Sequence, residues 1–180
     1  ITLLARLLGE HGSAADVPLA VRLMPHAEAI PLAGVETFLQ RHGSGRLEVI
    51  ALGLGGIHPP GGFRYRVVVD AAKGARLEDL LELMNLMDGL TWEVVQPIVD
   101  ALERQAGAEH GPAIAAALLV PRSQETEENR LRLLARLAAR TTNPVCLPPL
   151  RQLLVKGAAN GPVGDSVAEE VAKAMLELAG

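Results

Sequence analysis

The sequence has one cysteine and very few aromatic residues, and each scarcity excludes a class of site. Cys146 has no second cysteine to pair with, so the chain cannot form an internal disulfide or a cysteine-rich zinc site. Aromatic residues make up 2% of the 180 residues, too few for stacking single-stranded nucleic acid or a planar cofactor. We therefore expect no cofactor, and we interpret Cys146 as a buried apolar residue of a cytoplasmic protein.

Neither the charge nor the hydropathy of the chain points to nucleic acid or to a membrane. The formal net charge is −4, and no basic run or tail offers an electrostatic footprint for phosphates. The longest apolar runs, 49–57 and 113–120, fall well short of the roughly 20 residues that a membrane-spanning helix needs. We expect a partner other than nucleic acid, and no membrane span.

The motifs of common catalytic and metal sites are missing as well. The five histidines do not stand three or four residues from one another, from the cysteine or from a carboxylate in a way that identifies a metal site. The chain has no Gly-x-Ser-x-Gly motif and no phosphate-binding loop that ends in Gly-Lys-Ser/Thr. We predict no catalytic, metal or cofactor-binding residue, and a function other than catalysis is favoured.

The commonest pattern in the sequence is a stripe of apolar residues at the spacing of an α-helix. One such stripe, with acidic residues between its members, consists of Leu77, Leu80, Leu81, Met84 and Met87. The segment 92–105 is also expected to be a helix, bent at Pro97 because proline removes a backbone donor. Ser166 and Glu169 form a capping box for the last helix. The predicted fold is mainly α, with stacked helical pairs or an irregular bundle.

A possible β-hairpin at 46–70 interrupts this pattern. Phe63, Tyr65 and Val67 alternate with Arg64 and Arg66, which is typical of a strand. The apolar run 47–54 could be its partner. The alternative is that 47–54 is a buried helix, because periodicity does not separate short apolar runs.

A stretch near the start of the chain recurs near its end. Residues 3–24 and 133–154, aligned without a gap, share 7 identities in 22 positions, and five of them form the sequence Leu-Leu-Ala-Arg-Leu. Chance recurrence in a chain rich in these residues is the alternative.

The recurring unit is about 40 residues long and consists of a helix, a turn and a second helix. In its length and in the position of its proline, Pro18 or Pro148, it resembles HEAT and armadillo repeats. The resemblance covers 1–43 and 131–180 of a single domain, 1–180. It implies an α-solenoid that serves as an adaptor or scaffold for a protein partner.

Two other functions remain open: a small helical enzyme or phosphocarrier that uses His26, and a helical domain that binds an apolar ligand. Met24-Pro25-His26-Ala27 resembles the active-site histidine motif of the phosphocarrier domains of bacterial sugar transport systems, and 118–121 with 131–137 is similar to their strand and closing helix. That resemblance implies that His26 accepts a phosphoryl group, although the two segments stand further apart here than in that family. The third possibility is an apolar ligand held between helices.

The connection 55–62 contains the residues predicted to bind the partner: Ile57, His58, Pro59 and Pro60, followed by Phe63. Consecutive prolines restrict the backbone to an extended form, so this apolar tip would lose little entropy on binding. The alternative is an ordinary loop, since glycine pairs flank it on both sides.

Overall fold

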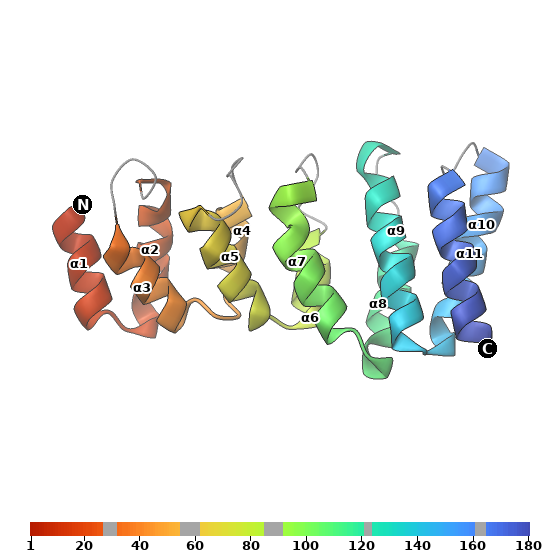
Figure 1. Ribbon diagram of the computed structural model, residues 1–180, viewed down its shortest axis with the longest axis horizontal. Coiled ribbons are helices and arrows are strands. Elements are labelled where there is room, and N and C mark those ends of the chain that lie inside the picture. The colour runs from red at the N-terminus through yellow and green to blue at the C-terminus, as the bar shows by residue number, and fades with distance from the viewer. Residues whose placement is uncertain (27–31, 55–61, 85–91, 121–123, 161–164) are drawn as a thin grey trace. The chain divides into compact units, whose positions relative to one another are not determined.

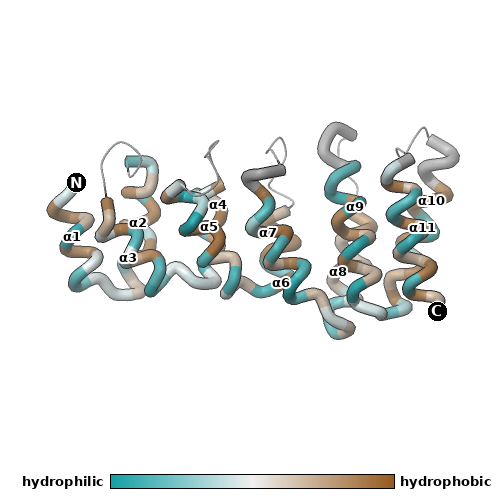
Figure 2. Tube along the Cα trace, in the orientation of Figure 1, coloured by the Kyte–Doolittle hydropathy of each residue, from teal (hydrophilic) through white to brown (hydrophobic). Residues whose placement is uncertain are grey.

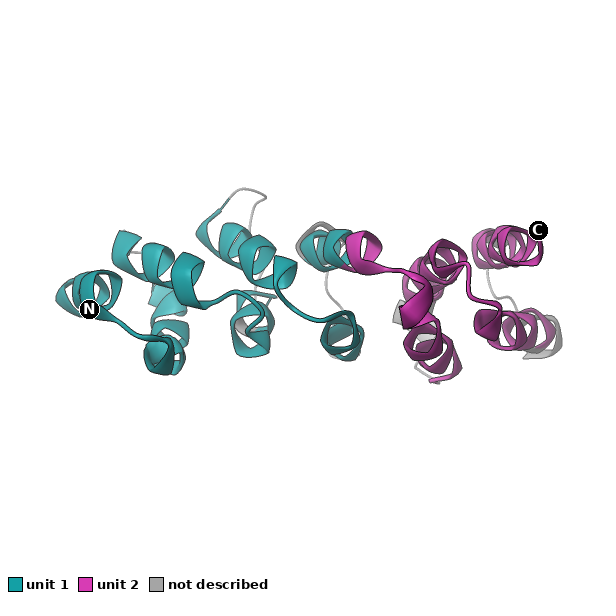
Figure 3. Ribbon diagram, turned by 90° about the horizontal axis from the view of Figure 1, so that it is seen from below, with its two compact units in different colours: residues 1–101 teal, residues 102–180 magenta. Residues whose placement is uncertain are grey.

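The chain folds almost entirely into helices. The computed structural model describes residues 1–26, 32–54, 62–84, 92–120, 124–160 and 165–180. Within these ranges it contains eleven α-helices, four short 3-10 helices and no strand (Figure 1). The prediction of a mainly α fold is confirmed. The residues divide into two compact units, Ile1–Ala101 and Leu102–Gly180, and the division falls inside one helix (Figure 3).

Unit 1 consists of two rows of helices. Its elements are α1 (Thr2–His11), η1 (Ala14–Asp16), α2 (Val17–Leu23), η2 (Met24–His26), α3 (Ala33–His42), α4 (Leu47–Leu54), α5 (Phe63–Lys73), α6 (Leu77–Met84) and most of α7 (Trp92–Gln105). One row places α3 between α1 and α5, and the other places α4 between α2 and α6. The rows pack on each other because α2 contacts α3 and α4 contacts α5.

Unit 2 repeats this arrangement with four helices. Its elements after the end of α7 are η3 (Ala108–His110), α8 (Gly111–Leu119), α9 (Gln124–Thr141), η4 (Pro144–Cys146), α10 (Leu147–Asn160) and α11 (Asp165–Ala179). Helices α8 and α10 lie side by side, as do α9 and α11, while α8 contacts α9 and α10 contacts α11. Each unit is thus a set of helical pairs in two rows.

Three helices begin in the same way, after a 3-10 turn and with proline as their second residue. The prolines are Pro18 of α2, Pro112 of α8 and Pro148 of α10. Proline fits there because the first amides of a helix have no intrahelical acceptor. The local sequence therefore fixes where these helices start.

The core of each unit comes from the apolar stripes of its helices (Figure 2). The largest fully buried side chains of unit 1 include Met24, Phe38, Ile50, Leu77, Leu80 and Ile98. Those of unit 2 include Leu102, Ile114, Leu134, Leu137 and Leu150. In Figure 2, apolar (brown) and polar (teal) stretches follow one another along the described helices.

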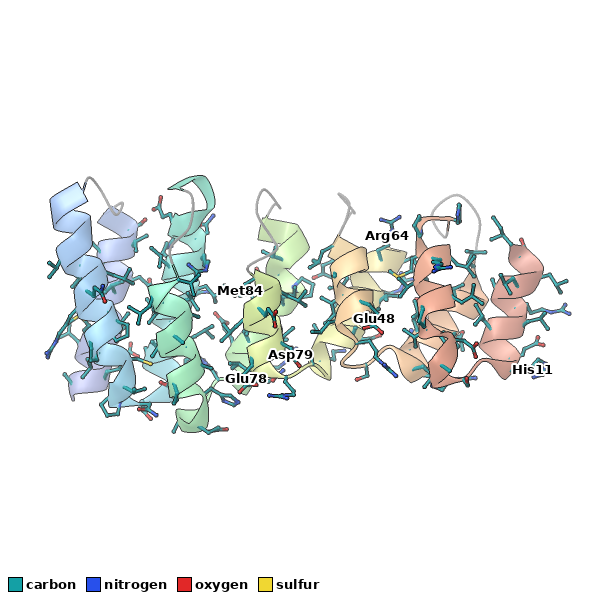
Figure 4. The ribbon with its side chains drawn as sticks, turned by 180° about the vertical axis from the view of Figure 1, so that it is seen from behind. His11, Glu48, Arg64, Glu78, Asp79 and Met84 are labelled. Atoms are coloured by element: carbon teal, nitrogen blue, oxygen red, sulfur yellow. The ribbon has the colours of Figure 1, made fainter. Side chains whose placement is uncertain are left out.

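The predicted hairpin at 46–70 is wrong, because 47–54 forms α4 and 63–73 forms α5. The buried residues of α5 follow a helical period and are Arg64, Val67, Val68, Ala71 and Ala72. Arg64, labelled in Figure 4, is only 9% exposed. Because Arg64 is charged, the sequence does not show that its position faces the core, and the helical period of α5 cannot be recognised. The alternation of Phe63 and Tyr65 with arginine then resembles a strand.

The start of the last helix also differs from the sequence pattern. Helix α11 begins at Asp165. Ser166 lies inside α11, where its hydroxyl donates to the Glu128 carboxylate of α9 and so links two neighbouring helices of unit 2. Ser166 is therefore the second residue of α11 and not its N-cap, and its hydroxyl joins α11 to α9.

The turn between α9 and α10 is held by hydrogen bonds of the buried Thr141 and Cys146 and the half-buried Asn143. The Thr141 hydroxyl donates to the Ala138 carbonyl at 2.7 Å and accepts from the Asn143 amide at 3.2 Å. The Asn143 side-chain nitrogen donates to the Ala108 carbonyl at 2.8 Å, and the Cys146 thiol donates to the Gly111 carbonyl at 3.4 Å. This turn is thereby fastened to the start of α8.

Candidate interaction surface

Helix α1 has two apolar faces, and only one of them is covered. Ala5 and Leu8 are buried, with 2% and 5% of their surface exposed. Leu3, Leu4 and Leu7 expose 63%, 39% and 42%. Three leucines at positions i, i+1 and i+4 lie on one face of a helix. The solvent face of α1 is therefore apolar, and we call Leu3, Leu4 and Leu7 the leucine face.

The covered face of α1 is held tightly against α3. A Cβ atom added at Gly9 would lie 2.8 Å from the Cα atom of Gly34, so the two backbones approach too closely for larger side chains. At the end of α1, the buried Phe38 ring occupies the space beside Gly12. The Arg41 guanidinium donates to the Gly9 carbonyl at 3.1 Å. This packing fixes which way the leucine face points.

Charged groups follow the leucine face along α1. Arg6 lies 3.6 Å from Glu10, and both side chains are more than half exposed. His11, labelled in Figure 4, ends the helix and is 3.7 Å from the other oxygen of the same carboxylate. Exposed pairs of this kind contribute about 0–1 kcal/mol each, so a partner could replace them at little cost. The face combines an apolar centre with a polar edge.

The same five-residue sequence has a covered environment in unit 2. Leu133, Leu134 and Leu137 of α9 expose at most 3% of their surface. In that unit α9 contacts α11, which lies beside it in the same row, and α8, which belongs to the other row. The identical sequence thus serves as core in one unit and as surface in the other.

Comparisons of the chain with models of protein families, with curated proteins and with solved structures found no match.

Unit 2 carries other exposed apolar side chains, but they are dispersed over several helices. The large ones are Leu119, Val120, Val145, Val155 and Leu176. On α8, Ile114, Ala115 and Leu118 are buried, while Ala116 and Leu119 are exposed. The apolar run 113–120 is therefore a helix with one buried face, although its composition alone would suit a fully buried one.

The structure describes one of the five residues predicted to bind the partner. Ile57, His58, Pro59 and Pro60 lie outside the described residues. Phe63 is the first residue of α5 and is half-buried. Sequence reasoning missed the leucine face. The sequence did contain a signal for it. The apolar residues of α1 extend around more of the helix circumference than one buried face requires.

The described histidines and the cysteine are not gathered into a second site. His26 ends η2 and is exposed. Cys146 is fully buried, and this burial raises the pKa of its thiol above the ordinary value. Among the described residues, no group of three His, Cys, Asp or Glu side chains could hold a metal ion. None of the described helices is long and apolar enough to cross a membrane.

Proposed function

We propose that the chain is a cytoplasmic protein-interaction module, an adaptor or scaffold built from helical pairs of the HEAT or armadillo kind. Each unit sets helical pairs in two rows, an arrangement that offers long outward helix faces for side-chain contacts. The net charge of −4 favours a protein over nucleic acid as the partner. The single cysteine, buried and unpaired, suits a reducing compartment.

The observation that carries this proposal is the leucine face of α1. Large apolar side chains that are contiguous and exposed mark interaction sites on folded proteins. Complete burial of a leucine contributes roughly 1.5–3 kcal/mol, so covering the exposed half of three leucines would contribute about 2–4 kcal/mol. Association itself costs several kcal/mol, so the leucine face would be the anchor of a larger interface.

The proposal is tested by capture of partners from the source organism with the full chain as bait. We expect the double variant Leu3→Glu with Leu7→Glu to lose at least nine-tenths of a captured partner, because two carboxylates would be desolvated in the contact. The control is Thr37→Glu with Gln40→Glu, which adds the same charge at exposed positions of α3. It should retain the partner.

Circular dichroism and thermal melting show whether each variant stays folded. A partner that both double variants capture as well as the original chain refutes the leucine face as the binding site. His26→Ala serves as a further control and should leave capture unchanged. Loss of the partner in His26→Ala, together with an acid-labile phosphoryl group on His26, would instead favour the phosphocarrier function.

A further inference from the structure

A histidine closes the turn between α7 and α8. His110 ends η3, and its Nδ1 atom accepts a hydrogen bond from the backbone amide of Gly107 at 3.2 Å. The His110 amide donates back to the Gly107 carbonyl at 3.0 Å, so two hydrogen bonds join the ends of the turn. The His110 side chain is 19% exposed. A ring nitrogen that accepts a hydrogen bond carries no proton, so this bond requires the neutral imidazole with its proton on Nε2.

A carboxylate competes for the same ring nitrogen. The Oε1 atom of Glu109 lies 3.6 Å from Nδ1 of His110, and the Glu109 side chain is 74% exposed. A carboxylate accepts hydrogen bonds and cannot donate one, so it attracts Nδ1 only when that atom carries a proton. The same carboxylate lies over Gly107, where an added Cβ atom would be 2.8 Å from Oε2. The Gly107 amide and the Glu109 carboxylate therefore require opposite protonation states of one atom.

The corresponding turn of unit 1 uses an acceptor that keeps its state. Asp16 ends η1 as His110 ends η3, and its carboxylate accepts the Ser13 amide at 2.9 Å. Hydrogen bonds from the backbone and the hydroxyl of Ser13 lower the pKa of Asp16. Asp16 therefore stays an acceptor throughout the pH range in which an imidazole gains its proton. The two turns have the same hydrogen-bond pattern, and they differ in whether protonation near neutral pH can break it.

The other charged groups near His110 do not substitute for Glu109. Among the described residues, η3 packs mainly against α8, which has no charged side chain, and against α9. The charged residues of α9 closest in sequence to its end are Arg136, which lies 2.8 Å from a Glu103 oxygen, and Arg140. Cys146 of η4 donates to the carbonyl of the residue after His110, and burial raises the pKa of its thiol, so it stays uncharged. Glu109 is thus the carboxylate available to a protonated His110.

The turn that His110 closes is also fastened to the turn between α9 and α10. The Asn143 side chain donates to the Ala108 carbonyl of η3 at 2.8 Å, and an added Cβ atom at Gly111 would lie 2.6 Å from that side chain. Thr142, beside Asn143, has a φ of 49°, which is strained for a β-branched residue. A change at His110 therefore acts on both turns.

We propose that His110 is a pH-sensitive switch of these two turns. The neutral imidazole keeps η3 closed by accepting the Gly107 amide, and the protonated imidazole releases that amide and donates to the Glu109 carboxylate instead. The proton comes from solvent, which reaches the exposed part of the ring. The switch belongs to unit 2, whereas the leucine face belongs to unit 1, so this inference does not depend on the interaction function.

The test is an NMR titration of the full chain, labelled with ¹⁵N, from about pH 8 to about pH 5. At the upper end the His110 ring should carry its proton on Nε2. As the ring gains a second proton, we expect the Gly107 amide to exchange hydrogen roughly three- to tenfold faster relative to the same amide in His110→Asp, the effect of one lost hydrogen bond. The variant copies Asp16 and accepts the amide at every pH tested. Residue 110 is not adjacent to Gly107, so the intrinsic exchange rate of that amide is the same in both chains.

Glu109→Gln tests the second half of the switch. The hydrogen bond at the upper end of the titration should be unchanged, and release of the Gly107 amide should require a lower pH, because the protonated ring has lost its acceptor. Release at an unchanged pH overturns the role of Glu109.

Two results overturn the switch itself. One is an Nδ1 atom that already carries a proton at the upper end of the titration. The other is a Gly107 amide whose exchange changes with pH in the same way in the original chain and in His110→Asp. The remaining histidines are present in both chains, so a change that they cause would appear in both.

Discussion

Gly34 lies where α3 crosses α1, and we expect Gly34→Ala to destabilise unit 1 although the change improves helix propensity. A glycine replaced by alanine in a helix interior gains about 1 kcal/mol from propensity alone, and this is an upper bound for Gly34, the second residue of α3. The added Cβ atom, however, would overlap the carbonyl oxygen of Ala5 and lie 2.6 Å from its carbonyl carbon. Both atoms belong to the backbone of α1, so no side chain can rotate away and the helices must separate.

The size of the effect follows from these opposing terms. Overpacking a tight contact costs typically 1–3 kcal/mol, and the upper part of that range applies where backbone must move. Subtracting the propensity gain leaves a net loss of about 1–2 kcal/mol. Local opening of α1 would then become about 5- to 30-fold more frequent.

Native-state hydrogen exchange of α1 and α3 amides, with thermal melting, measures this loss. The matched control is Thr37→Ala on the exposed side of α3, which should raise stability by a few tenths of a kcal/mol because only propensity changes. If Gly34→Ala is as stable as the original chain, or more stable, the close crossing of α1 and α3 is refuted.

Four further predictions address single features. Hydrogen bonds from the backbone amide and the hydroxyl of Ser13 lower the pKa of Asp16. The stability that this pair contributes is therefore present above the ordinary pKa of a carboxyl group and is lost as the pH falls through the lowered pKa. Ser13→Ala should raise the pKa of Asp16 in an NMR titration, and an unchanged pKa contradicts this prediction. Burial and a raised pKa should keep the Cys146 thiol unreactive to iodoacetamide at pH 8 until urea unfolds the chain, so fast native alkylation would be contrary evidence. Replacement of 57–60 by Gly-Ser-Gly-Ser should reduce partner capture at unchanged melting temperature, and full retention rules that loop out. An experimental structure should show α7 bent at Pro97, which a straight helix axis would disprove.

Local signals in the sequence were enough to predict the mainly helical fold and the helix 92–105. The apolar stripe that begins at Leu77 is such a signal, because it depends only on neighbouring residues. Helix α5 was mistaken for a strand because Arg64 occupies a buried position. What fills that position depends on helices distant in sequence, and periodicity does not report it.

The leucine face shows the same limit at the level of function. Leu-Leu-Ala-Arg-Leu forms a helix in both units, as its helix propensity requires, yet its leucines are covered in α9 and exposed in α1. The sequence of the helix cannot distinguish these cases, since the burial of its leucines depends on which other helices pack against it. Helix α1 is apolar on two faces and buried on one of them. Burial of the second face would contribute a further few kcal/mol of hydrophobic free energy. That driving force is the physical basis of the interaction function proposed for α1.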